Sequence, residues 1–128
     1  MSAVVLIMWR RAIAESLLNK LDTGPYIRLC YEPDYTKADI CVRQNNAKVA
    51  LIEAAETGAQ DVLKCLEICA ALRRDTENCK LILMCPDQDE EAVAQTVKAR
   101  QEGIIDDFVF YEVSFDYLNS KIMTLLQN

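Results

Sequence analysis

Short apolar runs alternate with helical patterns along this chain, and this alternation constrains the fold more than any other feature. The apolar runs cover residues 3–8, 26–31, 49–52, 81–85 and 108–113. Apolar residues at helical spacing follow at 10–21, 61–74, 87–100 and 114–125, with a weaker pattern at 38–43. Strands that alternate with helices predict a parallel sheet whose right-handed crossovers cover both faces. We therefore expect a doubly wound α/β fold with five strands in the order 2-1-3-4-5.

Turn and capping residues mark where the expected helices begin and end. Asp-Thr-Gly-Pro at residues 22–25 should end the first helix, and Gly103 lies beyond the helix that reaches residue 100. Asp87 and Glu90 resemble a capping pair at the start of that helix, and Ser114 is placed to cap the last one. The stretch at 38–43 has few apolar anchors, so we expect its helix to be short or frayed.

The length, charge and composition of the chain exclude several classes of function. A chain of 128 residues fits one domain, residues 1–128, with its own hydrophobic core. Its 20 acidic residues outnumber the 14 basic ones, so direct binding to the phosphates of nucleic acid is unfavourable. No apolar run approaches the roughly 20 residues of a membrane span. The sequence contains no histidine, which excludes imidazole bases, imidazole metal ligands and nucleophiles paired with histidine.

The cysteines indicate a reducing environment. They stand at residues 30, 41, 65, 69, 79 and 85 and include no C-x-x-C pair. The first residues, Met-Ser-Ala-Val-Val, lack the basic start of a secretory signal, so we expect a cytoplasmic protein with reduced, mostly buried thiols. Cys65 and Cys69 share a helix face, but no other ligand type is in register with them, so no metal site is expected.

In a doubly wound sheet the functional site lies at the carboxyl ends of the strands. Here those ends are residues 8–11, Glu32, 53–58, 85–87 and 111–114. The three glycines, at 24, 58 and 103, cannot form a phosphate-binding loop, and the turn after the first strand reads Met-Trp-Arg-Arg. No nucleotide or flavin cofactor is therefore expected.

The closing segment resembles a known family. Residues 103–108, followed by Val113, Ser114 and Leu118, are similar to the G-A-D-D-Y-L-x-K-P-F-S-x-x-x-L ending of response-regulator receiver domains. The run at 3–8, Leu-Ile-Glu at 51–53, the helix at 66–73 and the strand with its proline at 81–86 fall in the same order and at compatible distances. The resemblance covers essentially the whole chain, as a pattern of elements more than of signature residues. It implies a flavodoxin-like fold and a role in two-component signal transduction.

The residues that give receiver domains their chemistry are changed here. Receivers hold Mg²⁺ with an acidic pair after the first strand, are phosphorylated on an aspartate after the third, and use a Thr or Ser and a lysine after the fourth and fifth. At these positions the resemblance places Met8 and Trp9, Glu53, Cys85 and Tyr111, with Glu112 where proline usually follows the lysine. A thioether and an indole offer no oxygen to Mg²⁺, and a transferring phosphoryl group would find no cation. The chain thus resembles a degenerate receiver, or pseudo-receiver, without metal, aspartyl phosphorylation or enzymatic activity.

Glu53, at the phosphoacceptor-equivalent position, leaves two interpretations open. It can present a fixed negative charge that imitates the phosphorylated state, or it can be a solvated loop carboxylate. Adjacent strands lie about 4.8 Å apart, so an arginine just past the first strand can reach the end of the third. We predict that Arg10 or Arg11 forms a charge-assisted hydrogen bond with Glu53 in place of the metal.

The energy of this pair depends on its exposure. An exposed pair contributes only about 0 to 1 kcal/mol, and a larger contribution requires burial against Trp9. We therefore expect Glu53→Gln to alter association while thermal stability stays nearly unchanged.

Three other altered positions have alternatives of their own. Trp9 and Tyr111 are expected to fill the vacated pocket rather than to form an aromatic patch that faces a partner. Cys85 is a candidate redox sensor, but beside Pro86 and an acidic run its thiolate gains no positive neighbour, so we expect an inert thiol.

The resemblance implies a signalling module that works by protein contact. Its dimer is expected to form through the fourth helix at 87–100, the fifth strand at 108–113 and the fifth helix. Such domains commonly precede a DNA-binding domain, so we expect the N-terminal part of a transcriptional regulator, with any output domain beyond residue 128. Two alternatives stay open: a small-ligand sensor whose pocket is shaped by Met8, Trp9 and Tyr111, or a flavodoxin-like enzyme with cysteine or carboxylate chemistry.

Overall fold

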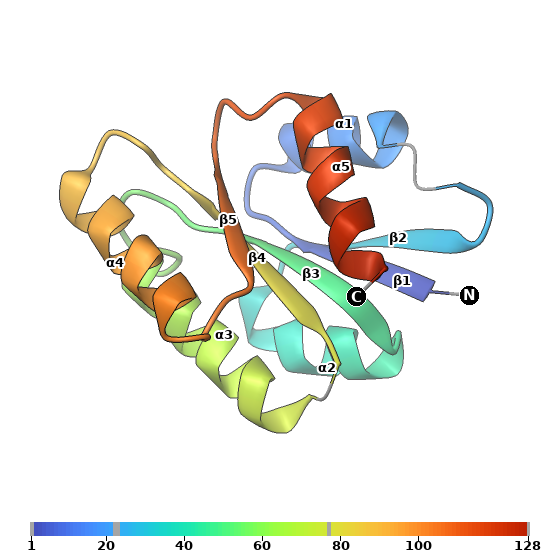
Figure 1. Ribbon diagram of the computed structural model, residues 1–128, viewed down its shortest axis with the longest axis horizontal. Coiled ribbons are helices and arrows are strands. Elements are labelled where there is room, and N and C mark those ends of the chain that lie inside the picture. The colour runs from blue at the N-terminus through green and yellow to red at the C-terminus, as the bar shows by residue number, and fades with distance from the viewer. Residues whose placement is uncertain (1, 22–23, 77, 128) are drawn as a thin grey trace.

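A single sheet of five parallel strands lies at the centre of the structure (Figure 1). The computed structural model describes residues 2–21, 24–76 and 78–127. The strands are β1 (Ser2–Ile7), β2 (Ile27–Glu32), β3 (Ala47–Glu53), β4 (Lys80–Cys85) and β5 (Asp107–Phe110). They lie in the order β2-β1-β3-β4-β5, and every neighbouring pair is parallel. The predicted doubly wound α/β fold, including its strand order, is confirmed.

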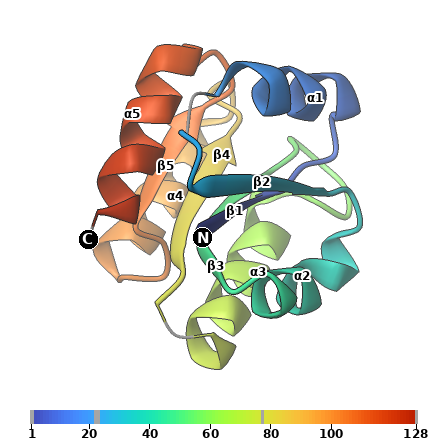
Figure 2. The ribbon, with the colours of Figure 1, turned by 90° about the vertical axis from the view of Figure 1, so that its right-hand side faces the viewer.

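Within the described residues, five α-helices cover the two faces of the sheet. They are α1 (Arg11–Lys20), α2 (Ala38–Gln44), α3 (Val62–Asp75), α4 (Glu90–Gln101) and α5 (Phe115–Leu126), and a 3₁₀ turn, η1 (Tyr35–Lys37), precedes α2. α1 and α5 pack on one face, and α2, α3 and α4 pack on the other (Figures 1 and 2). None of these helices is long and apolar enough to span a bilayer.

The side chains of β1 show how the sheet supports both layers. Val4 and Leu6 pack against the layer of α1 and α5, whereas Val5 and Ile7 pack against the layer of α2, α3 and α4. All four side chains are fully buried. Burial of a valine, leucine or isoleucine contributes roughly 1.5–3 kcal/mol relative to exposure. The strand is therefore anchored from both sides, and this fixes where the residues after it lie.

The start of α4 differs from the sequence prediction. Asp89 caps the helix, and its carboxylate accepts hydrogen bonds from the amides of Glu91 and Ala92 at 3.0 and 3.3 Å. The expected capping pair of Asp87 and Glu90 is therefore wrong. The chain enters the helix two residues later, and an aspartate at that position satisfies the free N–H groups of the first turn.

β5 is shorter than the apolar run that predicted it. It ends at Phe110, where the amide of Val113 donates back to the carbonyl of Phe110 at 3.1 Å and closes a turn. Tyr111 therefore lies in the loop after the strand and not within it. The predicted cap of α5 is confirmed, because Ser114 Oγ accepts a hydrogen bond from the amide of Tyr117 at 3.1 Å.

The helix expected to be short or frayed is α2, and the stop expected at residues 22–25 follows α1. α2 has seven residues and is held by two buried side chains, Ala38 and Val42, so it is short as expected. α1 ends at Lys20, and Gly24 has a φ of 81°, a left-handed conformation that favours glycine. Asp22 and Thr23, which were expected to help end this helix, lie outside the described residues.

All six cysteines are free thiols, and four of them are buried on the face of the sheet that α2, α3 and α4 cover: Cys65, Cys69, Cys79 and Cys85. Burial raises the pKa of Cys65 and of Cys79 to about 12, because a thiolate is poorly solvated there. Burial also raises the pKa of Cys69 and of Cys85. The folded chain therefore keeps these thiols protonated at a pH where the unfolded chain ionises them.

We predict that the chain loses stability as the pH rises above about 8.5, the ordinary pKa of a thiol. The unfolded state then releases protons that the folded state keeps, so the free energy of unfolding falls with pH. Each strongly shifted thiol contributes a loss of about 2 kcal/mol between about pH 8 and pH 10. Urea unfolding at the two pH values measures this loss, and Cys79→Ala should reduce it. A free energy of unfolding that stays constant over this range contradicts the prediction.

Candidate functional site

The carboxyl end of β3 brings together several residues that the sequence singled out. β3 lies between β1 and β4, and its last residue, Glu53, pairs in register with Met84 of β4. On the other side Ile52 pairs with Ile7, so the residues that follow β1 pass beside Glu53. Glu53 is fully buried, which is rare for a glutamate unless it is paired.

Both oxygens of the Glu53 carboxylate accept N–H groups from the segment after β1. Oε1 accepts hydrogen bonds from the backbone N–H groups of Trp9 and Arg10, each at 3.1 Å. Oε2 accepts one from Nε of Arg10 in an ion pair. The predicted contact between an arginine after the first strand and Glu53 is confirmed for Arg10. Arg11 instead lies over the ring of Tyr31, 5.5 Å from its centroid.

Two aromatic rings and a sulfur atom surround the rest of the Arg10 side chain. Its guanidinium carbon lies 4.1 Å from the ring centroid of Tyr111 and 5.8 Å from that of Trp9. Its Nη2 lies 3.8 Å from Sδ of Met84. The side chain is 27% exposed. Guanidinium groups stack well on aromatic faces, so the cation is fixed between Tyr111 and Glu53.

Two tyrosine hydroxyls donate to backbone carbonyls at the same strand end. The hydroxyl of Tyr111 donates to the carbonyl of Ala54, and that of Tyr35 donates to the carbonyl of Glu53. Burial, and then the nearby charge of Glu53, raise the pKa of Tyr111 to about 12. Burial raises the pKa of Tyr35 far above its usual value. Both hydroxyls stay protonated near neutral pH and act as donors. Sequence reasoning missed Tyr35, because its part of the sequence has little helical or strand pattern.

The other predicted positions differ in where the structure places them. Met8 is fully buried in the layer of α1 and α5. Cys85 is buried on the opposite face, where Oγ1 of Thr96 donates to its sulfur at 3.4 Å. Trp9 is 45% exposed, so the expectation that it fills the vacated pocket is wrong. Its amide is tied to Glu53, while Arg10 and Tyr111 take the space beside that carboxylate.

A hollow of about 350 Å³ lies beside the half-exposed indole of Trp9. It is lined by Trp9, Ala55, Glu56, Thr57, Gln60 and Tyr111. Tyr111 lines this hollow too, and its ring also stacks on the guanidinium of Arg10.

The burial of Glu53 excludes one of the two roles left open for it. A solvated loop carboxylate would be exposed, and Glu53 is fully buried. The negative charge of Glu53, which could imitate that of a phosphoryl group, is balanced internally by Arg10. The pair instead ties the segment after β1 to the end of β3.

A metal ion at this edge of the sheet would find few free oxygen ligands. Mg²⁺ is bound by several oxygens in near-octahedral geometry, and both oxygens of Glu53 already accept N–H groups. Across residues 2–21, 24–76 and 78–127, no group of three or more acidic, cysteine or histidine side chains is placed to hold a metal ion.

Comparisons with known proteins identify the fold. No protein-family model matches the sequence, and no curated protein matches it. Among solved structures, the chain is similar to a DNA-binding response regulator of the LuxR family from Staphylococcus aureus, with 14% identity and a TM-score of 0.77 over 98% of this chain and 99% of that one.

Two further solved structures give the same result. The receiver domain of the Francisella response regulator 1452 is 18% identical, with a TM-score of 0.77 over 99% of this chain and 98% of that one. The signal receiver domain of a modulated diguanylate cyclase from Desulfovibrio desulfuricans G20 is 21% identical, with a TM-score of 0.74 over 99% of this chain and 94% of that one. The chain therefore has the receiver-domain fold, as the sequence resemblance implied.

We predict that Glu53→Gln lowers the free energy of unfolding by about 1 to 3 kcal/mol. The amide keeps one acceptor oxygen but turns an NH₂ group toward Nε of Arg10, which leaves buried donors unsatisfied and a cation unbalanced. This replaces the expectation of nearly unchanged stability, which does not hold for a carboxylate without exposed surface. Urea unfolding of the two proteins measures the difference.

The matched control for this substitution is Asp39→Asn. It breaks the exposed ion pair of Asp39 with Arg43 within α2, where the two side chains are 42% and 58% exposed. It should cost less than about 0.5 kcal/mol, because exposed helix pairs contribute little. Equal losses in Glu53→Gln and Asp39→Asn would refute the structural importance of the buried carboxylate.

Proposed function

We propose that this chain is a cytoplasmic receiver-like signalling module that acts by protein contact, without aspartyl phosphorylation and without catalysis. The observation that carries the proposal is the buried pair of Glu53 and Arg10, stacked against Tyr111 at the carboxyl end of β3. By the resemblance, this region corresponds to the one in which receiver domains hold their metal ion and their phosphoryl group.

The chemistry of phosphoryl transfer supports the proposal. Transfer to a carboxylate needs an accessible nucleophile and a cation that stabilises the charge on the phosphoryl oxygens. Glu53 is fully buried, and the cation beside it is already paired. Met8 and Trp9, at the positions of the acidic pair, carry no side-chain oxygen. The side chains of this site therefore bind one another and are not arranged to accept a phosphoryl group.

The α4-β5-α5 face supports contact with a second copy of the chain. β5 is an edge strand, and a hollow of about 440 Å³ lies along it between α4 and α5. Phe110 is 37% exposed there and packs edge to face on Phe108, with ring centroids 5.7 Å apart. Arg100 and Lys121 flank the hollow together with Asp107, so the face carries both charge signs. A face with both signs around an apolar centre can be self-complementary about a two-fold axis.

The fold neighbours support a place in transcription regulation. The Staphylococcus aureus protein is a DNA-binding response regulator. With 20 acidic and 14 basic residues, this chain is a poor ligand for DNA phosphates. We therefore assign DNA contact to a separate output domain and partner contact to this one.

We predict that the chain gains no phosphoryl group from acetyl phosphate in the presence of Mg²⁺. Glu53 is fully buried, and the cation beside it, Arg10, is already paired with its carboxylate. Intact-mass spectrometry of the full chain after incubation measures the result, with a phosphorylatable receiver domain as the positive control. A mass increase of one phosphoryl group that disappears in Glu53→Gln would overturn the proposal.

We predict that the chain forms a dimer and that Phe110→Asp dissociates it. A carboxylate at the centre of the α4-β5-α5 face would lie in the apolar part of the interface. Tyr26→Asp adds the same charge at a residue that is 78% exposed and lies before β2, so it is the matched control and should leave the dimer intact. Sedimentation velocity measures the three proteins. A monomeric wild type, or equal dissociation of both variants, contradicts this use of the face.

A further inference from the structure

A second surface, separate from the α4-β5-α5 face, lies between α3 and α4. We call it the α3-α4 groove. α3 contributes Leu63, Leu66 and Ala70, which are spaced as residues i, i+3 and i+7 of one helix face, and α4 contributes Gln95 and Ala99. The groove has a volume of about 540 Å³. Its shape follows from the sequence, because Ala70 and Ala99 are too small to fill the space between the two helices.

The groove combines core residues with apolar surface that the core leaves exposed: Ala99 is buried and Leu66 and Ile104 pack partly against the core, whereas Leu63 stays exposed. α3 buries a different stripe against the sheet, formed by Val62, Cys65, Cys69 and Leu72. Leu63 points away from that stripe and is 55% exposed. Ile104, from the connection to β5, closes one end of the groove. A hollow that is lined by alanine and has an exposed leucine beside it can receive apolar side chains from another molecule.

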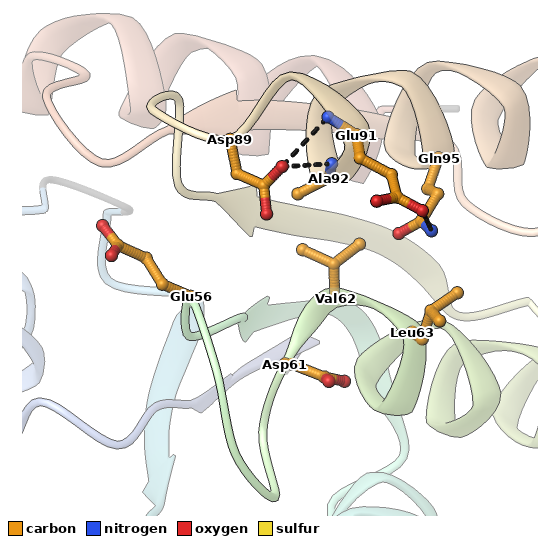
Figure 3. A pocket seen from close by; sticks show the side chains of 8 residues that line it. All are labelled: Glu56, Asp61, Val62, Leu63, Asp89, Glu91, Ala92 and Gln95. Atoms are coloured by element: carbon orange, nitrogen blue, oxygen red, sulfur yellow. Dashed lines mark hydrogen bonds between the residues drawn. The ribbon is translucent and has the colours of Figure 1, made fainter.

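The other end of the groove is acidic. A smaller hollow of about 160 Å³ shares Leu63 and Gln95 with the groove and so continues it. Four carboxylates surround this hollow: Glu56, Asp61, Asp89 and Glu91. Figure 3 shows Glu56 and Asp61 on the side of the β3–α3 loop and Asp89 and Glu91 on the side of α4, with Val62 between them.

Positive charge balances these four carboxylates only in part: Asp61 and Asp89 cap the N-termini of α3 and α4, which are the positive ends of those helices. In the described part of the chain, the one ion pair among them joins Asp61 to Lys64, with 3.9 Å between Nζ and Oδ2. One carboxylate oxygen of Asp89 accepts hydrogen bonds from the amides of Glu91 and Ala92. Carboxylates gathered around a hollow create a negative potential that favours a cationic partner.

We propose that the α3-α4 groove docks an amphipathic helix of a partner protein. Leucine-like side chains at i, i+3 or i+4, and i+7 of that helix enter the apolar part, and lysine or arginine residues at one of its ends meet the four carboxylates. A helix is the fitting occupant because the groove is formed by two helices, and a third can pack its ridges into the space between them.

A second copy of this chain does not fit the same surface. The apolar part of the groove is rimmed by Glu67 and Glu102 against a single lysine, Lys98. Two copies joined through this face would therefore place acidic residues opposite acidic or mixed ones in either orientation. The acidic end requires a partner with an excess of basic residues, so it is complementary to another protein.

The experiment is a selection of helix-forming peptides of about 20 residues, long enough to hold a helix, on the full chain. The expected peptides carry apolar residues at helical spacing and basic residues clustered at one end. Their affinity should fall at least about tenfold with Leu63→Asp and with Glu91→Lys. It should also fall as the salt concentration rises, because the charged contact lies at the surface.

Matched controls separate the groove from general effects of charge and exposure. Ile40→Asp changes an apolar residue on α2 that is 48% exposed, and Glu15→Lys reverses an exposed charge on α1. Both should bind the selected peptides within about twofold of the wild type. Thermal unfolding checks that all four variants fold. The proposal is overturned if no peptide is enriched, if the enriched peptides lack basic residues, or if Leu63→Asp and Glu91→Lys bind like the controls.

Discussion

The ion pair of Glu53 and Arg10 is the interaction on which the carboxyl edge of the sheet depends. Removing a carboxylate from water costs several kcal/mol unless hydrogen bonds and an opposite charge compensate it. Here two backbone N–H groups and the Nε of Arg10 supply that compensation. The segment after β1 therefore cannot leave the end of β3 without exposing an unpaired buried charge. The adjacent hydroxyls of Tyr35 and Tyr111 hold the same strand end through its carbonyls.

The proposed loss of receiver chemistry rests on this constraint. A receiver-domain fold provides strand ends at which charged groups converge, but the residues at those ends decide what happens there. In this chain the convergent groups satisfy one another. In the function that we propose, this chain acts through its surface, and α4 contributes to both of the proposed contact faces: Arg100 lies at the α4-β5-α5 face, whereas Gln95 and Ala99 lie in the α3-α4 groove.

The sequence predicted the fold and the central contact well, because both follow from backbone periodicity. Alternating strands and helices determine strand order, and strand order places Arg10 beside Glu53. Features that depend on side-chain direction were not predictable in the same way. The outward position of Trp9 follows from its amide bonding to Glu53, and the role of Tyr35 follows from a loop with no clear pattern. The burial of Glu53 required the structure too, since a glutamate just after an apolar run is usually exposed.

The most direct test of this account is a double-mutant cycle between the two partners. Arg10→Met, Glu53→Gln and the combined variant are unfolded in urea beside the wild type, so that the contacts of Arg10 with Tyr111 and Met84 cancel. A buried pair that fixes the strand end predicts a favourable coupling free energy of about 1 to 3 kcal/mol. The double variant should then lose less free energy of unfolding than the two single variants lose together. A coupling free energy near zero would show that the two side chains act independently and would contradict the account.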